Sequence, residues 1–184
     1  MADPQRADAQ RNRTRILDAA YAAFTADPEV SLNAIAKRAG VGPGTLYRHF
    51  PSREALLLAV YQQEIDCLGE LVGELLQEKP PLDAFRAWAR KLAELVRVKH
   101  GLGEALATPS AQAVIDATYG PVTNAIQQLL AAAVAGGDIR GGVDAADVLL
   151  LLSALWRVPA GEEGLAQADR ILDMIVSSLA SPAQ

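Results

Sequence analysis

The sequence predicts an all-α protein with a small N-terminal head of three helices and a larger C-terminal helical domain. Apolar residues recur every three or four positions along most of the chain, and no run of alternating β-branched residues extends beyond a few positions. Proline and glycine clusters separate the periodic stretches, at Asp27-Pro28, at residues 42–44 and at Pro80-Pro81. We expect residues 1–53 to form the head and residues 54–184 the larger domain, linked by a helix that begins near residue 53.

The first helix is expected over about residues 8–26. An apolar stripe begins at Ile16 and recurs four, seven and eight positions later, as on the buried face of a helix. Asp27-Pro28 ends this helix, because proline lacks an N–H donor and disfavours helix at the residue before it. Three basic residues near the helix start predict either a solvated face or a nonspecific phosphate clamp: Arg11, Arg13 and Arg15.

Two short helices follow, joined by a tight turn. Ser31 is the expected N-cap of a helix over residues 32–39. Gly40 ends that helix, since the residue after a helix often needs a positive φ. Pro43 suits the first turn of the next helix, where a missing N–H is harmless, and this helix is expected to run to Phe50.

The second short helix is expected to expose polar residues. Leu46 and Phe50 are i, i+4 partners that pack inward. Two short helices across a glycine-containing turn, covered by a preceding helix, form a helix-turn-helix unit whose second helix enters the DNA major groove. The residues left to meet a groove or a phosphate are Gly44, Thr45, Tyr47 and Arg48.

The charge distribution favours the same interpretation. The chain carries a net charge of −5, yet residues 1–53 hold eight Lys or Arg against five Asp or Glu, and residues 54–184 hold nine against seventeen. Attraction to phosphate depends on local cationic groups and not on the charge of the whole molecule. A basic head is therefore compatible with nucleic acid binding.

The remaining helices are expected at about residues 53–77, with Ser52 as cap, and at 82–98, 110–136, 144–157 and 165–180. The Gly120-Pro121-Val122 stretch predicts a kink or a restart of a helix beside Tyr119. The late helices are more apolar than surface helices need to be, as in "DVLLLLSALW". That excess predicts either a subunit interface or an internal core.

The stretches "RILDAAYAAF" and "SLNAIAKRAGVGPGTLYRHFPSREALLLAV" resemble the N-terminal DNA-binding domain of TetR-type transcriptional regulators, over residues 13–60. Asp27-Pro28 replaces the glycine usual after the first helix, and Gly42 replaces a common serine. Arg53 occupies the position where the family usually has a phosphate-binding lysine. The resemblance implies that bases and phosphates are contacted by Asn33, Gly42, Pro43, Gly44, Thr45, Tyr47, Arg48 and His49.

Each of these side chains also has an ordinary structural interpretation. Arg48 is expected to contact a base, favouring guanine through its bidentate guanidinium, or a phosphate; its alternative is a solvated cation. Tyr47 packs, binds phosphate through its phenol, or does both. Thr45 is expected to bind a phosphate, and His49 contacts DNA or lies on the helix surface.

The resemblance further implies that the C-terminal domain binds a small-molecule effector and forms a homodimer, with ligand occupancy changing the separation of the two heads. Paired heads must reach successive major grooves about 34–36 Å apart, which supports a dimer independently. A pocket combines aromatic walls with a few polar groups, and core packing is the alternative for each candidate. The candidates are Phe85, Trp88, His100, Tyr119, Trp156 and Arg157.

Other classes of protein find little support. The chain has two histidines and lacks the G-x-S-x-G, H-E-x-x-H and P-loop motifs of common enzymes, although a Ser/His/Asp site on His100 stays open. A helical adaptor that binds protein through the head also stays open.

The single cysteine, Cys67, excludes an internal disulfide and is expected to be buried rather than a redox sensor. We expect no cofactor, metal or membrane partner and a cytoplasmic location, because the longest apolar run, 148–156, is too short to cross a bilayer.

Overall fold

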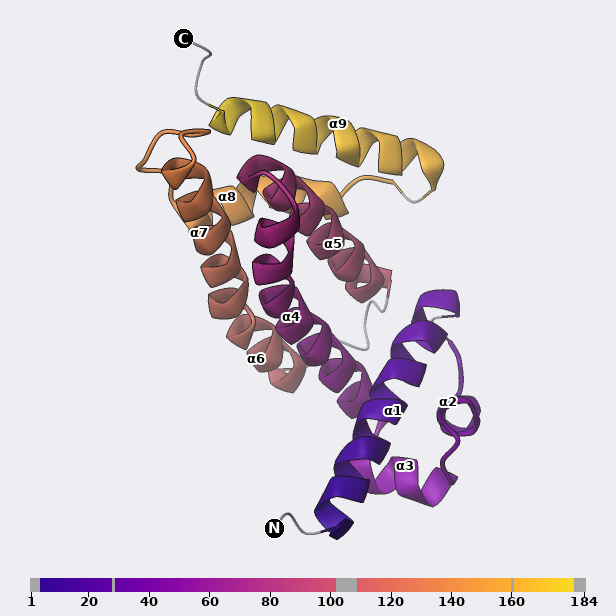
Figure 1. Ribbon diagram of the computed structural model, residues 1–184. Coiled ribbons are helices and arrows are strands. Elements are labelled where there is room, and N and C mark those ends of the chain that lie inside the picture. Colours follow the sequence, from indigo (N-terminus) through magenta and orange to yellow (C-terminus); the bar gives the residue numbers. More distant parts are fainter. Residues whose placement is uncertain (1–3, 28, 102–108, 160, 181–184) are drawn as a thin grey trace. The chain divides into compact units, whose positions relative to one another are not determined.

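The computed structural model describes residues 4–27, 29–101, 109–159 and 161–180, and the side chains of residues 8–27, 29–96, 112–159 and 161–180. These residues form helices and no strand, apart from an isolated bridge between Ile139 and Ala180, so the all-α prediction is confirmed (Figure 1). The helices are α1 (Pro4–Ala26), α2 (Leu32–Ala39), α3 (Pro43–His49), α4 (Arg53–Glu78), α5 (Pro81–Gly101), α6 (Pro109–Ala117), α7 (Tyr119–Ala135), α8 (Ala145–Leu152), the 3-10 helix η2 (Ser153–Trp156) and α9 (Glu162–Leu179).

The chain packs as two units. The first contains residues 1–64 and 101–115, and the second contains residues 65–100 and 116–184. The beginning of α4 belongs to the first unit because Leu56, Leu57 and Val60 are buried in the core of the head. This packing unit is longer than the 53 residues that the sequence suggested for the head, and the domain boundary at residue 53 stays a prediction.

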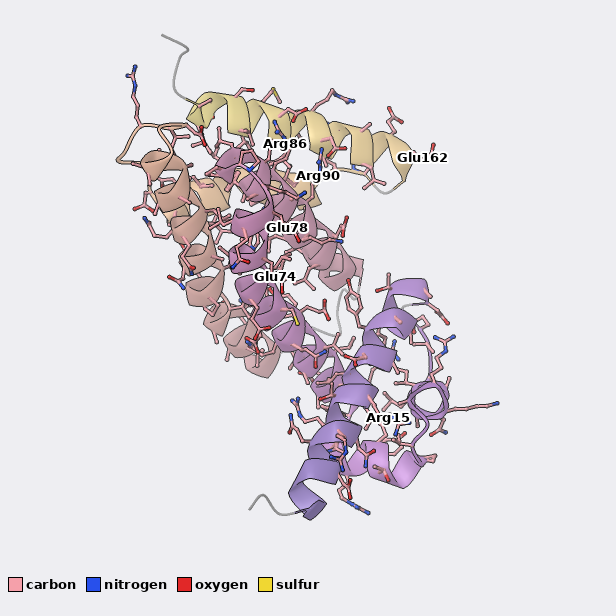
Figure 2. All side chains as sticks on the ribbon, in the orientation of Figure 1. Arg15, Glu74, Glu78, Arg86, Arg90 and Glu162 are labelled. Carbon is pink, nitrogen blue, oxygen red and sulfur yellow. The ribbon has the colours of Figure 1, made fainter. Side chains whose placement is uncertain are left out.

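The head forms around the predicted caps. The Ser31 hydroxyl accepts a hydrogen bond from the Ala34 amide at 3.2 Å, which satisfies a donor that the first turn of α2 leaves unpaired. Gly40 ends α2 with a φ of +65°. A Cβ at this position would also lie 2.6 Å from Nη2 of Arg15, which extends from α1 over the turn (Figure 2). The positive φ therefore favours glycine here, whereas the guanidinium is the end of a flexible, exposed side chain that can move aside.

The second unit is built around an indole. Trp88 on α5 is 0% exposed, and its Nε1 donates a hydrogen bond to the Leu68 carbonyl of α4 at 2.9 Å, so its polar atom is satisfied inside the core. Helix α9 is held to α5 by ion pairs from Arg86 to Asp173 at 3.1 Å and from Arg90 to Asp169 at 2.8 Å. Figure 2 shows the two arginines extending from α5 toward α9.

Three expectations concern Cys67 of α4 and the segments that form α6 to η2. The helix expected over 110–136 divides at Thr118 into α6 and α7, and Pro121 lies in the first turn of α7, which confirms the expected restart. The segment expected over 144–157 is α8 followed by the 3-10 turn η2. The expectation that Cys67 is buried is wrong: it is exposed, because the buried stripe of α4 runs through its neighbours Ile65 and Leu68.

The described residues contain neither a candidate membrane span nor a candidate metal cluster. None of their helices is both long enough and apolar enough to be a membrane span. Within the same residues, His, Cys, Asp and Glu side chains do not gather in groups of three or more that could hold a metal ion.

Candidate nucleic-acid interface

Helix α3 divides its side chains between the core and the surface. Leu46 is fully buried and Phe50, which caps the helix, is 3% exposed, so both pack inward as predicted. Tyr47 is 47% exposed, Arg48 is exposed and Thr45 is half-buried. The polar face of α3 therefore consists of Thr45, Tyr47 and Arg48, and we call it the α3 face.

The start of α3 is slim and open. Gly42, Pro43 and Gly44 are exposed, and a Cβ placed at either glycine would meet no atom of the chain within 4 Å. Neither glycine has a positive φ, so the fold itself does not require them. Their small size is thus available for the close approach of a partner, as expected at the beginning of a recognition helix.

Arg53 differs from Arg48 in its surroundings. The Arg53 guanidinium is half-buried, donates a hydrogen bond to the Val30 carbonyl and lies 4.9 Å from the centre of the Phe24 ring. This arginine therefore joins α4 to α1 and to the segment before α2. Its contact with phosphate stays a prediction, and the structure adds a second role that its position in the sequence does not reveal.

The other predicted contacts lie around the same short helices. Asn33 is exposed near the start of α2, and His49 is half-buried with its ring 6.2 Å from that of Phe50. Among the N-terminal arginines, Arg11 is ion-paired with Asp8, whereas the guanidinium of Arg13 lies 5.5 Å from the Phe50 ring. The Arg11–Asp8 pair is local, three residues apart on one helix, whereas the Arg13 contact had no local sequence signal because it depends on how α1 packs in space.

The carboxyl groups of Asp18 on α1 and Glu64 on α4 interact electrostatically. Burial raises the pKa of Glu64, and the charge of Asp18 raises it further. The Asp18 carboxylate also accepts a hydrogen bond from Gln63 at 3.0 Å. Repulsion between the ionised carboxylates opposes the packing of α4 on α1, and protonation of Glu64 relieves it.

The residues predicted to line a ligand pocket are dispersed. Phe85 and Trp88 lie in the core, Tyr119 is 53% exposed at the start of α7, and Trp156 and Arg157 lie at the end of η2. His100 lies in the last turn of α5, but its side chain lies outside the described residues. A ligand role for these six residues stays a prediction.

The second unit contains a cavity of about 200 Å³ between α5, η2 and α9. None of the five predicted pocket residues with described side chains lines it. Sequence reasoning missed this cavity because its walls come from three helices whose spacing is not encoded locally. Its lining residues are Arg90, Ala93, Glu94, Leu155, Leu165, Ala168, Asp169 and Leu172.

A three-helix head with an exposed polar second helix and a local excess of basic residues defines the helix-turn-helix class of DNA-binding regulators, and not a class of enzymes. Two family models match the chain: "Bacterial regulatory proteins, tetR family" over residues 16–60, and "Transcriptional regulator SbtR-like, C-terminal domain" over residues 80–181. The chain belongs to the TetR family of bacterial transcriptional regulators.

Individual relatives agree with this assignment. The chain is 27% identical to the transcriptional regulator UidR of Escherichia coli over 165 residues, covering 83% of this chain and 81% of UidR. The TetR regulator SCO0520 of Streptomyces coelicolor is 35% identical, with 93% of this chain and 99% of that one covered and a TM-score of 0.78. LfrR of Mycobacterium smegmatis, solved with proflavine, shares the fold at 21% identity and TM-score 0.57, with 95% and 99% covered.

Proposed function

We propose that this protein is a ligand-responsive regulator, and most simply a repressor, that binds palindromic operator DNA as a homodimer in the cytoplasm. The observation that carries this proposal is the α3 face: Tyr47 and Arg48 are exposed and Thr45 is half-buried on the second helix of a helix-turn-helix. The glycines at the start of α3 leave room for the DNA backbone. The acidic charges that dominate the rest of the chain lie outside residues 1–53.

Within the interface, we assign different roles to the exposed side chains. Arg48 reads a base, with guanine as the best partner for its two parallel N–H donors. Thr45 and Tyr47 donate their hydroxyl protons to phosphate oxygens and fix the position of the helix in the groove. Loss of a single base contact costs about 1–3 kcal/mol, so Arg48 alone has a measurable effect.

Side chains exposed by the second unit support the proposed homodimer. Leu150 is 72% exposed and Leu151 is 52% exposed on α8, and Met174 is 63% exposed on α9. Exposed large apolar side chains on two neighbouring helices favour burial against another protein surface. A second copy of the chain provides that surface, and its two-fold symmetry matches a palindromic DNA site.

A small molecule would control DNA binding through the second unit. LfrR binds proflavine within the same fold, and the second unit of this chain contains a cavity of about 200 Å³. A ligand that binds one arrangement of the dimer better than another shifts the population of that arrangement. The spacing of the two heads, and with it the DNA affinity, then depends on the ligand.

The proposal is tested by selecting duplexes from a random pool with the purified protein and mapping the retained site by nuclease protection. We expect a palindromic site. Arg48→Ala should weaken binding to it by about tenfold or more, whereas Arg140→Ala, which removes an exposed arginine of the second unit, should leave binding unchanged. Equal affinities of the parent and Arg48→Ala for selected and random duplexes would contradict the proposal.

A further inference from the structure

The cavity between α5, η2 and α9 combines an apolar interior with a charged rim. Ala93, Leu155, Ala168 and Leu172 are buried, and Leu165 is about half exposed at the opening. The volume of about 200 Å³ exceeds that of an apolar cavity of about 150 Å³ that accommodates benzene. The cavity therefore suits a molecule of one ring or a short branched chain, smaller than the ligands of typical drug-binding pockets.

The rim carries an uneven number of charges. Its ionisable groups are Arg90 and Glu94 from α5 and Asp169 from α9. Arg90 donates from Nε to Oδ1 of Asp169 at 2.8 Å, so these two charges compensate each other across the opening. Among the described lining groups, Glu94 carries a charge that no other compensates, so the charges of these groups sum to −1.

The existing partner of Glu94 lies outside the cavity. Lys91 approaches Oε2 of Glu94 at 3.2 Å on the same helix, and both side chains are more than half exposed. Exposed pairs of this kind contribute about 0–1 kcal/mol, so a competing cation can replace Lys91 at little cost. An anionic ligand is disfavoured at Arg90, because it would have to displace the Asp169 carboxylate and lie close to the negative charge of Glu94.

We propose that this cavity binds a compact primary amine, with its ammonium group on Glu94 and its apolar body against Ala93, Leu155, Leu165, Ala168 and Leu172. Burial of the apolar body supplies most of the affinity, and the negative rim selects the cation over an equally large neutral or anionic molecule. The binding site itself rests on the cavity alone. Only its regulatory consequence, a change in DNA affinity, rests on the proposed function.

The test uses three probes with the same ring: benzylamine, which is protonated at pH 7, benzyl alcohol and benzoate. Binding to the full chain without DNA is followed by NMR of leucine methyl groups. We expect shifts at Leu155, Leu165 and Leu172 and not at Leu150 or Leu151, which lie outside the cavity lining. Benzylamine should bind about two- to fivefold more tightly than benzyl alcohol, and benzoate should bind most weakly.

Two matched variants locate the selecting charge. Glu94→Gln should reduce the affinity for benzylamine to that for benzyl alcohol, whereas Glu78→Gln, at an exposed glutamate of α4 away from the cavity, should preserve the preference. Failure of benzylamine to bind, equal or tighter binding of either other probe, or an unchanged preference in Glu94→Gln overturns the proposal. Because no DNA is present, each of these results leaves the operator-binding proposal to be judged on its own experiment.

Discussion

The two units of this protein expose different chemistry to solvent. The head presents the hydroxyl, phenol and guanidinium groups of the α3 face, whereas the second unit presents Leu150, Leu151 and Met174. The first surface suits a hydrated polyanion and the second suits an apolar partner. The two proposed associations of the chain should therefore differ: salt should weaken DNA binding more than dimerisation, and loss of apolar area should weaken dimerisation more than DNA binding.

Two arginines of the head also differ in their surroundings. Arg48 is exposed on α3, whereas Arg53 is half-buried between the Val30 carbonyl and the Phe24 ring. Both positions resemble DNA-contacting positions of the TetR family. The Arg48 side chain is nevertheless accessible to DNA, whereas the Arg53 side chain already links α4 to α1 and to the segment before α2.

The largest effect is expected from Trp88→Ala, which removes a fully buried indole and leaves the Leu68 carbonyl without its donor. We expect the second unit to lose about 3–5 kcal/mol of stability. Trp156→Ala, at a half-buried indole of η2, should cost less. Chemical denaturation followed by circular dichroism measures the free energy of unfolding of both variants. A larger loss of stability in Trp156→Ala than in Trp88→Ala would contradict the assignment of Trp88 to the core.

Leu150→Asp tests the apolar surface directly. If a second copy covers Leu150, the substitution loses the burial of a leucine side chain, about 1.5–3 kcal/mol, and places a charge in the interface. We expect a shift from dimer to monomer in sedimentation at micromolar concentration with the helical content unchanged. Val134→Asp, at a less exposed apolar residue of α7 (42% against 72% for Leu150), serves as the control. A parent protein that sediments as a monomer excludes the proposed dimer.

Replacing two glycines of the head by alanine should affect folding at one position and DNA binding at the other. Gly40→Ala should destabilise the head by about 1–2 kcal/mol, because it places an L-residue at a φ of +65°. Gly44→Ala meets no such conformational cost and should preserve or raise thermal stability while weakening DNA binding. Thermal melts compare the stability of the two variants, and duplex titrations compare their DNA affinity. A lower melting temperature for Gly44→Ala than for Gly40→Ala would contradict the prediction.

The smallest effect is expected from Glu64→Gln. Because its pKa is raised in the folded state, Glu64 holds its proton more tightly there than in the unfolded chain, and the resulting stabilisation is lost as the pH rises through that raised pKa. The glutamine cannot ionise, so the variant should melt slightly higher than the parent at neutral pH. This difference should shrink as the pH falls toward the ordinary pKa of glutamate. Thermal melts over that range check the trend, which a growing difference at acid pH would refute.

The sequence predicted the parts of the fold whose causes are local. Ser31, Gly40 and Pro43 act where their own chemistry places them, at a helix start, a helix end and a first turn. The second role of Arg53 and the lining of the cavity depend on which helices meet in space, and neither has a local signature. The exposure of Cys67 depends on the rotational register of α4, which the apolar residues on several sides of that helix left ambiguous.

The most direct measurement is the affinity for the selected duplex as a function of salt, for the parent and for Arg48→Ala. We expect the logarithm of the parent's affinity to fall steeply and linearly with the logarithm of salt concentration, and Arg48→Ala to bind more weakly throughout. An association that barely responds to salt and is indifferent to Arg48 would mean that the α3 face binds protein or nothing, and not DNA.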